Sequence, residues 1–225
     1  MNQFKLSPDD LKDIQNAAAE AESQTSGEIA SAMILESSSY SFPEILFSLF
    51  GGVLFFLVSL FAYNPIETFI ARLFWEPESW YVTASIGIIT IVVIGLLFLI
   101  TNIPGVDRMI VPAAVRKKKV HRRALVQFLE SGVHNTRDRT GILLFISLRE
   151  QRVEILADVG ISALVTQDRW DEILSELTGQ IQKGELKQGL ITAITDCGKI
   201  LSTHFSRKSD DTNELPDGLV ILEES

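Results

Sequence analysis

The chain is short of cysteine, of familiar catalytic motifs and, over two long stretches, of any charge. Cys197 is the only cysteine among 225 residues, so no internal disulfide can form, which agrees with a reducing compartment. The sequence contains no phosphate-cradling glycine loop, no paired-cysteine metal pattern and no HExxH zinc helix. The missing motifs count against an ordinary nucleotidase.

Charged side chains are absent from residues 45–66 and from residues 79–106. The chain as a whole has a net charge of −9, yet its mean hydropathy is +0.22. A bilayer core about 30 Å thick is crossed by roughly 20 apolar helical residues, so both stretches are long enough to span it. Two buried core helices are the alternative, but a soluble fold of this size rarely hides two uncharged helices on every face. We therefore predict a transmembrane hairpin over residues 43–103, and not a cytosolic globule or a disordered acidic chain.

The charges on either side of the predicted spans indicate their orientation. Residues 108–123 contain seven Lys and Arg and no acid, whereas the link between the spans has only Arg72. The link also carries Trp75, Trp80 and Tyr81, which suit the headgroup boundary. Because basic residues resist translocation, we predict a multi-pass protein of the cell (inner) membrane with both termini and the polar domain cytoplasmic. The polar start of the chain predicts no cleaved signal peptide.

The polar remainder predicts one small α/β domain. We expect helices over 8–24, 113–135, 166–182 and 185–205, and strands over 28–36, 142–148 and 152–158. Residues 1–42 offer one helix and one strand, while residues 113–205 lack a first strand, so neither flank can close a core alone. The economical solution is a small β-sheet flanked by helices, with the transmembrane hairpin inserted into a loop and residues 206–225 as a polar tail.

Three sequence blocks, in this order, resemble the TPM domain family. They are SGEI at 26–29, RTGILLFISLREQRVEILADVGI at 139–161, and TQDRWDEIL at 166–174. The block around Gly141 and Gly160 is the most specific, and the chain looks most like the bacterial branch in which a membrane hairpin interrupts the domain. The resemblance implies a compact α/β sandwich, and members have been described as acid phosphatases, as divalent-cation binders or as assembly and repair factors.

Three acids are candidate metal ligands. Asp158 ends the third predicted strand, and Asp168 and Asp171 open the helix that follows. Strand ends and helix N-termini commonly meet at one rim of an α/β domain, where carboxylates could hold a hard cation such as Ca²⁺ or Mg²⁺. The alternative interpretation is that acids in a first helical turn only complement the helix dipole.

No catalytic residue is assigned from the sequence. His121 lies among bases, and His134 and His204 lie near helix ends; none has a serine or cysteine next to it in sequence. Ser147 and Ser162 are candidates by residue type alone. A catalytic site assembled from residues of distant loops remains an alternative.

Six bases follow the second span as a cluster: Arg116, Lys117, Lys118, Lys119, Arg122 and Arg123. This basic cluster is expected as a topology signal, and contact with anionic lipid headgroups is the second interpretation. Nucleic acid is disfavoured as a partner because no aromatic residues are interleaved with the bases. We expect an interaction, assembly or quality-control factor that acts on other membrane proteins; the alternative is a membrane-tethered acid-phosphatase-like hydrolase, with Ca²⁺ or Mg²⁺ as the candidate cofactor.

Overall fold

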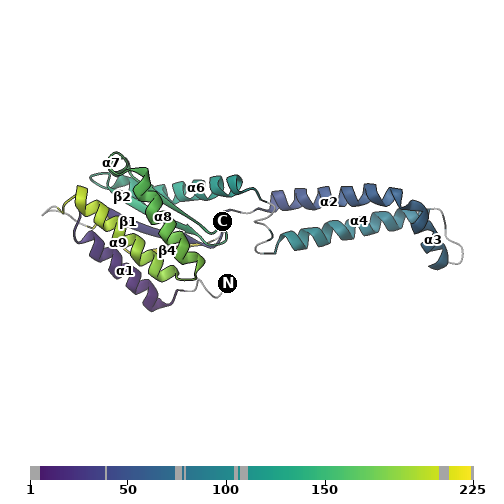
Figure 1. The fold of residues 1–225 in the computed structure, drawn as a ribbon, viewed down its shortest axis with the longest axis horizontal. Coiled ribbons are helices and arrows are strands. Elements are labelled where there is room, and N and C mark those ends of the chain that lie inside the picture. The colour runs from purple at the N-terminus through teal and green to yellow at the C-terminus, as the bar shows by residue number, and fades with distance from the viewer. Residues whose placement is uncertain are drawn as a thin grey trace. The chain divides into compact units, whose positions relative to one another are not determined.

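The computed structural model describes residues 6–38, 40–73, 78, 80–103, 106, 111–207 and 213–223. The chain divides into two units, one formed by residues 1–38 with 114–225 and the other by residues 39–113. The first unit is an α/β domain, which confirms the predicted fold class, and the second is a helical hairpin (Figure 1).

The α/β domain is built on a mixed four-stranded sheet in the order β3-β2-β1-β4. Strands β1 (Glu28–Ile34) and β2 (Gly141–Ser147) run parallel, and β3 (Arg152–Ala157) is antiparallel to β2. Every residue of β1 and β2 is buried, as the short apolar run of a central strand requires. The strand before the hairpin and the strand after it therefore form the centre of one sheet.

Helices cover both faces of this sheet. Helices α1 (Pro8–Glu22), α8 (Gln167–Gln182) and α9 (Leu186–His204) pack on one face, and α6 (Ala113–Glu130) packs on the other (Figure 1). Successive side chains of a strand point to opposite faces, so Leu144 belongs to the first core and Phe145 to the second. Because both faces of β2 are buried, its residues form a continuous apolar run.

Local signals in the sequence account for the start of α1 and for its contact with α9. The hydroxyl of Ser7 accepts a 3.1 Å hydrogen bond from the backbone N–H of Asp10, whose carboxylate accepts one from the N–H of Ser7 at 2.9 Å. Lys187, at the start of α9, contacts Asp10 at 2.9 Å and Asp13 at 2.6 Å. Its hydrogen bond with Asp13 is the largest of the effects that raise the pKa of Lys187 to about 12.

Three elements were not predicted: α3 (Tyr63–Leu73), α7 (Val159–Ser162) and β4 (Leu219–Leu222). Strand β4 lies in the expected polar tail and pairs in parallel with the second half of β1, so the described sheet has four strands where three were expected. A four-residue apolar run carries too little periodicity to be recognised as a strand from sequence.

The hairpin unit contains α2 (Ser41–Phe61), α3 and α4 (Trp80–Thr101). Helices α2 and α4, of 21 and 22 residues, are long and apolar enough to cross a membrane. They pack closely, because a Cβ on Gly52 of α2 would lie 2.2 Å from Cγ1 of Ile94 on α4. Large apolar side chains point away from this contact, and Phe50 and Ile91 are 70% and 71% exposed.

Candidate functional site

Asp158 is held by structural partners at the end of β3. Its side chain is only 5% exposed, and Oδ1 accepts a 2.6 Å hydrogen bond from the N–H of Val159 as the N-cap of α7. The other carboxylate oxygen lies 3.4 Å from Nε of Arg139. Asp158 therefore caps a helix and forms an ion pair.

The other two predicted ligands lie on the exposed first turns of α8. Oδ1 of Asp171 accepts a 2.9 Å hydrogen bond from Nε2 of Gln167, and Asp168 is exposed beside them. Among the described residues, no group of three or more His, Cys, Asp or Glu is arranged to hold a metal ion, and the assignment of Asp158, Asp168 and Asp171 as ligands stays a prediction. Binding of Ca²⁺ or Mg²⁺ stays a prediction.

The glycines of the 139–161 block permit two close backbone approaches. A Cβ on Gly141 would lie 2.3 Å from the carbonyl oxygen of Val133, and one on Gly160 would lie 2.6 Å from that of Arg139. Arg139 has a φ of 59° and donates a 2.8 Å hydrogen bond from Nη1 to the carbonyl of His134. The block that resembles the TPM family thus makes close backbone contacts at the end of the sheet where β2 begins and β3 ends.

A cluster of acids that sequence reasoning missed surrounds a small cavity near the start of β1. The cavity has a volume of about 120 Å³ and is lined in part by Glu22, Glu28 and Asp217. Burial is the largest cause that raises the pKa of Glu22 to about 8, and the neighbouring carboxylates of Glu28 and Asp217 act in the same direction. Oε1 of Glu22 accepts a 2.9 Å hydrogen bond from the N–H of Ile29. No sequence pattern links the three acids, because they come from α1, β1 and the segment before β4.

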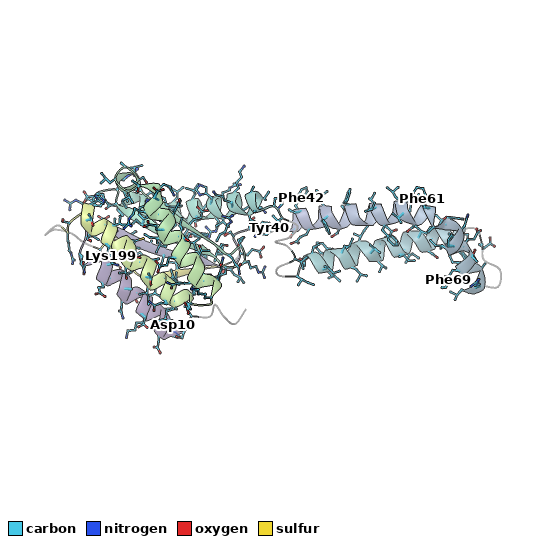
Figure 2. All side chains as sticks on the ribbon, in the orientation of Figure 1. Asp10, Tyr40, Phe42, Phe61, Phe69 and Lys199 are labelled. Atoms are coloured by element: carbon cyan, nitrogen blue, oxygen red, sulfur yellow. The ribbon has the colours of Figure 1, made fainter. Side chains whose placement is uncertain are left out.

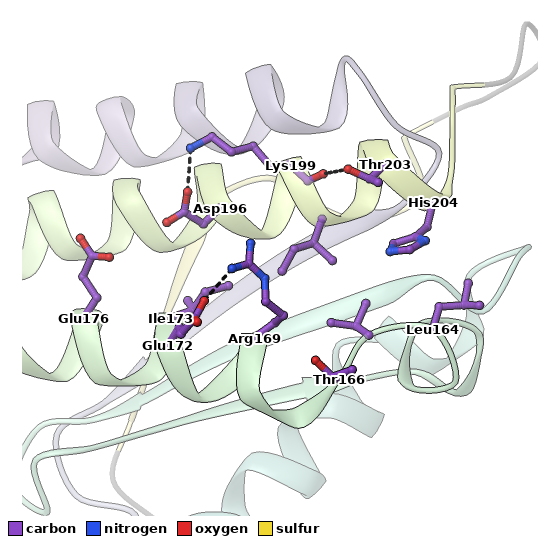
Figure 3. A pocket seen from close by; sticks show the side chains of 12 residues that line it. Leu164, Thr166, Arg169, Glu172, Ile173, Glu176, Asp196, Lys199, Thr203 and His204 are labelled. Carbon is purple, nitrogen blue, oxygen red and sulfur yellow. Dashed lines mark hydrogen bonds and ion pairs between the residues drawn. The ribbon is translucent and has the colours of Figure 1, made fainter.

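A larger groove of about 500 Å³ lies between α8 and α9 (Figure 3). Its cations are engaged by acids of the same helix: Arg169 contacts Glu172 at 2.6 Å, and Lys199 contacts Asp196 at 2.7 Å. The apolar side chains of the lining are Leu164, Val165, Ile173 and Ile200, and the remaining members are Thr166, Glu176, Thr203 and His204. The groove mixes apolar contact with charges of both signs, which suits a protein segment better than a small anion.

The two serines considered by residue type are both used structurally. Ser147 is fully buried; its hydroxyl donates to the carboxylate of Glu150 and accepts a 2.7 Å hydrogen bond from Ser37. Ser162 donates to the carbonyls of Ala157 and Asp158 at 3.0 and 3.1 Å. A fully buried hydroxyl cannot reach a substrate, so Ser147 is not a nucleophile in this conformation.

Three members of the basic cluster lie on the outward side of α6, and the other three are half-buried. Lys117, Lys118 and Arg122 are exposed, while Val120 and Ala124 of the same helix are fully buried against the sheet. Arg123 contacts Glu130 at 3.3 Å, and His121 contacts Glu154 of β3 at 3.2 Å. The exposed bases are accessible to an anionic surface.

Comparisons with known proteins agree with this fold. Residues 109–200 match the family model of the TPM domain. The solved NMR structure of the BA42 protein from the psychrophilic bacterium Bizionia argentinensis is similar, with a TM-score of 0.57, 20% sequence identity, and coverage of 99% of this chain and 100% of that one. A search of curated proteins found no match to the sequence. The structural likeness shows the fold.

Proposed function

We propose that this chain, which carries a TPM domain matched over residues 109–200, is a membrane-anchored interaction or assembly factor that works on the cytoplasmic face of the cell membrane. One observation carries the proposal: Glu28 pairs with Gly141 and Ile34 pairs with Ser147, in register across the inserted hairpin. A domain whose two central strands flank a pair of spans is tethered to the membrane at its core.

This pairing constrains the membrane topology. Strands β1 and β2 can form one ladder only when both ends of the hairpin emerge on the same side of the bilayer. Two spans satisfy this condition, whereas one span would not. The exposed bases of α6, which follow the second span within the chain, favour the cytoplasm as that side and offer contact with anionic lipid.

An adaptor role is supported by the α8–α9 groove. Its cations are neutralised by acids of the same helices, so it presents apolar side chains bordered by charges of both signs, as protein-binding surfaces do. The nearest rival is a phosphate-monoester hydrolase, for which the groove offers His204 with the hydroxyls of Thr166 and Thr203.

Cysteine accessibility in intact cells tests the topology. We replace Cys197, which is buried, with Ala, and introduce Thr68→Cys on the exposed side of α3 or Ser175→Cys on the exposed side of α8. An impermeant maleimide should label the Thr68→Cys variant in intact cells and the Ser175→Cys variant only after permeabilisation. The reverse pattern would overturn the cytoplasmic assignment.

An assay of the purified full chain separates adaptor from enzyme. We expect no hydrolysis of p-nitrophenyl phosphate with or without Ca²⁺ or Mg²⁺, and recovery of a crosslinked membrane protein that is lost in an Ile200→Glu variant of the groove. Turnover that is abolished by His204→Gln in the groove, and retained in the exposed control Glu20→Gln, would instead establish the hydrolase.

A further inference from the structure

Helix α3 breaks away from the first apolar helix for a reason visible in its sequence. Helix α2 ends at Phe61 and α3 begins at Tyr63, with Pro65 two residues further on. Proline has no N–H to donate to the carbonyl four residues earlier, and its ring crowds that carbonyl, so α2 cannot continue past Phe61. Helix α3 consequently turns out of the direction of α2 at the loop end of the hairpin (Figure 1).

This short helix has one apolar and one polar side. The apolar residues recur at helical spacing, at Tyr63, Ile66, Phe69, Ile70 and Leu73. The opposite side carries Asn64, Glu67, Thr68 and Arg72, all of them exposed. With one acid and one base, the polar side has no net charge.

Packing within the hairpin covers only part of the apolar side. Ile70 is 6% exposed and packs against Val82 and Ile86 of α4. Phe69 and Leu73 remain 64% and 68% exposed, although both belong to the same apolar side. Tyr63 and Ile66 pack against the same cluster, so among the described residues of α3 it is Phe69 and Leu73 that leave the apolar side exposed.

Two further large apolar residues are exposed at the loop end of the two apolar helices. Phe61, the last residue of α2, is 92% exposed, and Trp80, the first residue of α4, is 63% exposed. Phe61 and Phe69 both lie at the loop end of the hairpin (Figure 2). Aromatic rings at the ends of spans are the side chains favoured at the headgroup boundary.

We propose that α3 is an interfacial anchor that lies in the plane of the membrane at the loop end of the hairpin, with Phe69 and Leu73 inserted at the boundary between headgroups and acyl chains. The inference rests on the proposed membrane insertion and adds a lipid-binding element to it. An amphipathic helix whose polar side has no net charge binds such a boundary through buried apolar area. Because α3 is packed on α4 through Ile70, its position would set the depth of the second span.

Adjacent residues of α3 provide a matched test. In a Cys197→Ala background, Phe69→Cys and Thr68→Cys each place one thiol on α3, on the apolar and the polar side respectively. Both variants of the full chain carry an NBD fluorophore and are reconstituted into vesicles of phosphatidylcholine and phosphatidylglycerol. Quenching is measured with doxyl-labelled lipid and, separately, with aqueous cobalt.

We expect the label of the Phe69→Cys variant to be quenched several-fold more by the doxyl lipid than that of the Thr68→Cys variant, with the order reversed for cobalt. Equal cobalt quenching at both positions would overturn the proposal. Protection of the Phe69→Cys label from both quenchers would also overturn it, because a second copy or another protein would then cover α3.

Extraction at alkaline pH distinguishes failure of this inference from failure of the proposed membrane anchor. If both variants resist extraction from the vesicles but cobalt reaches both labels equally, the proposed membrane spans are supported and the proposed interfacial position of α3 is overturned. If both variants are extracted, the membrane anchor itself fails, and the inference fails with it.

Discussion

The hydroxyl of Ser37 donates a 2.7 Å hydrogen bond to the hydroxyl of Ser147, joining the segment that leads into the hairpin to the last residue of the strand that follows it. Ser147 in turn donates to Glu150, whose other oxygen accepts a 3.1 Å hydrogen bond from the N–H of Ser37. Glu150, Ser37 and Ser147 are all at most 4% exposed. The turn after β2 thus holds the chain where it leaves the α/β domain for α2.

Removing the central hydroxyl should weaken the α/β domain. In Ser147→Ala, the buried carboxylate of Glu150 loses a donor and Ser37 loses an acceptor, which should lower the free energy of unfolding by about 1–3 kcal/mol. Denaturation of the full chain in detergent micelles measures the change. Ser175→Ala, on the exposed side of α8, is the control and should have little effect; equal stability of the two variants would contradict the buried network.

A methyl group at Gly141 should be costly, whereas one at Gly179 should not. The new Cβ of Gly141→Ala would lie 2.3 Å from the carbonyl of Val133, so the backbone must shift and we expect a loss of about 1–3 kcal/mol. Gly179 lies inside α8 with nothing within 4 Å of a Cβ, and Gly179→Ala should stabilise the domain by about 0.5–1 kcal/mol. Melting temperatures that shift in the same direction for both variants would refute this account of the close approach at Gly141 in the 139–161 block.

Glu22 should make stability depend on pH. Its pKa rises from 4.5 to about 8 in the folded domain, chiefly through burial, so between these values the unfolded chain releases a proton that the folded chain keeps. Stability contributed by the protonated carboxyl is therefore complete below about pH 4.5 and is lost as the pH rises through about 8. Glu22→Gln, which cannot ionise, should melt at a higher temperature than the original chain at pH 8 and at the same temperature at pH 4.

The control for this prediction is Glu20→Gln, an exposed position on the same helix. It should leave the melting temperature unchanged at both pH values. A Glu22→Gln variant whose advantage is the same at pH 4 and pH 8 would show that packing, and not ionisation, causes the difference.

Contact between α2 and α4 should depend on Gly52. Gly52→Val places a side chain where Ile94 lies 2.2 Å from the Cβ position, so the helices must separate, whereas the Cβ of Gly95→Val would have nothing within 4 Å. Spin labels on Phe61→Cys and Trp80→Cys, in a Cys197→Ala background, should report a longer and broader distance in Gly52→Val only. An unchanged distance in Gly52→Val would show that the two helices do not pack through this glycine.

Long elements were predictable from the sequence because their signals are local. The two long apolar helices follow from runs without charge, and α1, α8 and α9 follow from apolar residues at helical spacing with recognisable starts and ends. Helix α3 was missed because 11 residues with Pro65 inside them resemble a loop. Strand β4 was missed because its four residues are a strand only through pairing with β1.

The candidate sites were less predictable than the elements. The sequence placed Asp158 at the end of the third strand, and in the structure it follows directly after Ala157, the last residue of β3. Its partner Arg139 comes from a separate segment, and the pairing changes what the carboxylate does. Glu22, Glu28 and Asp217 share one cavity although almost 200 positions separate the first from the last. Sequence spacing carries no information about such a cluster.

The sequence by itself determined the two apolar helices, the acidic α/β class of the remainder and the basic segment after the second apolar helix, because hydropathy, charge and short-range periodicity are sums over neighbouring residues. Only the tertiary structure decided that β1 and β2 are central partners, that Ser147 is sealed from solvent and that part of α3 is left uncovered. Pairing and burial depend on residues that are distant along the chain, and the folded backbone alone brings those residues together.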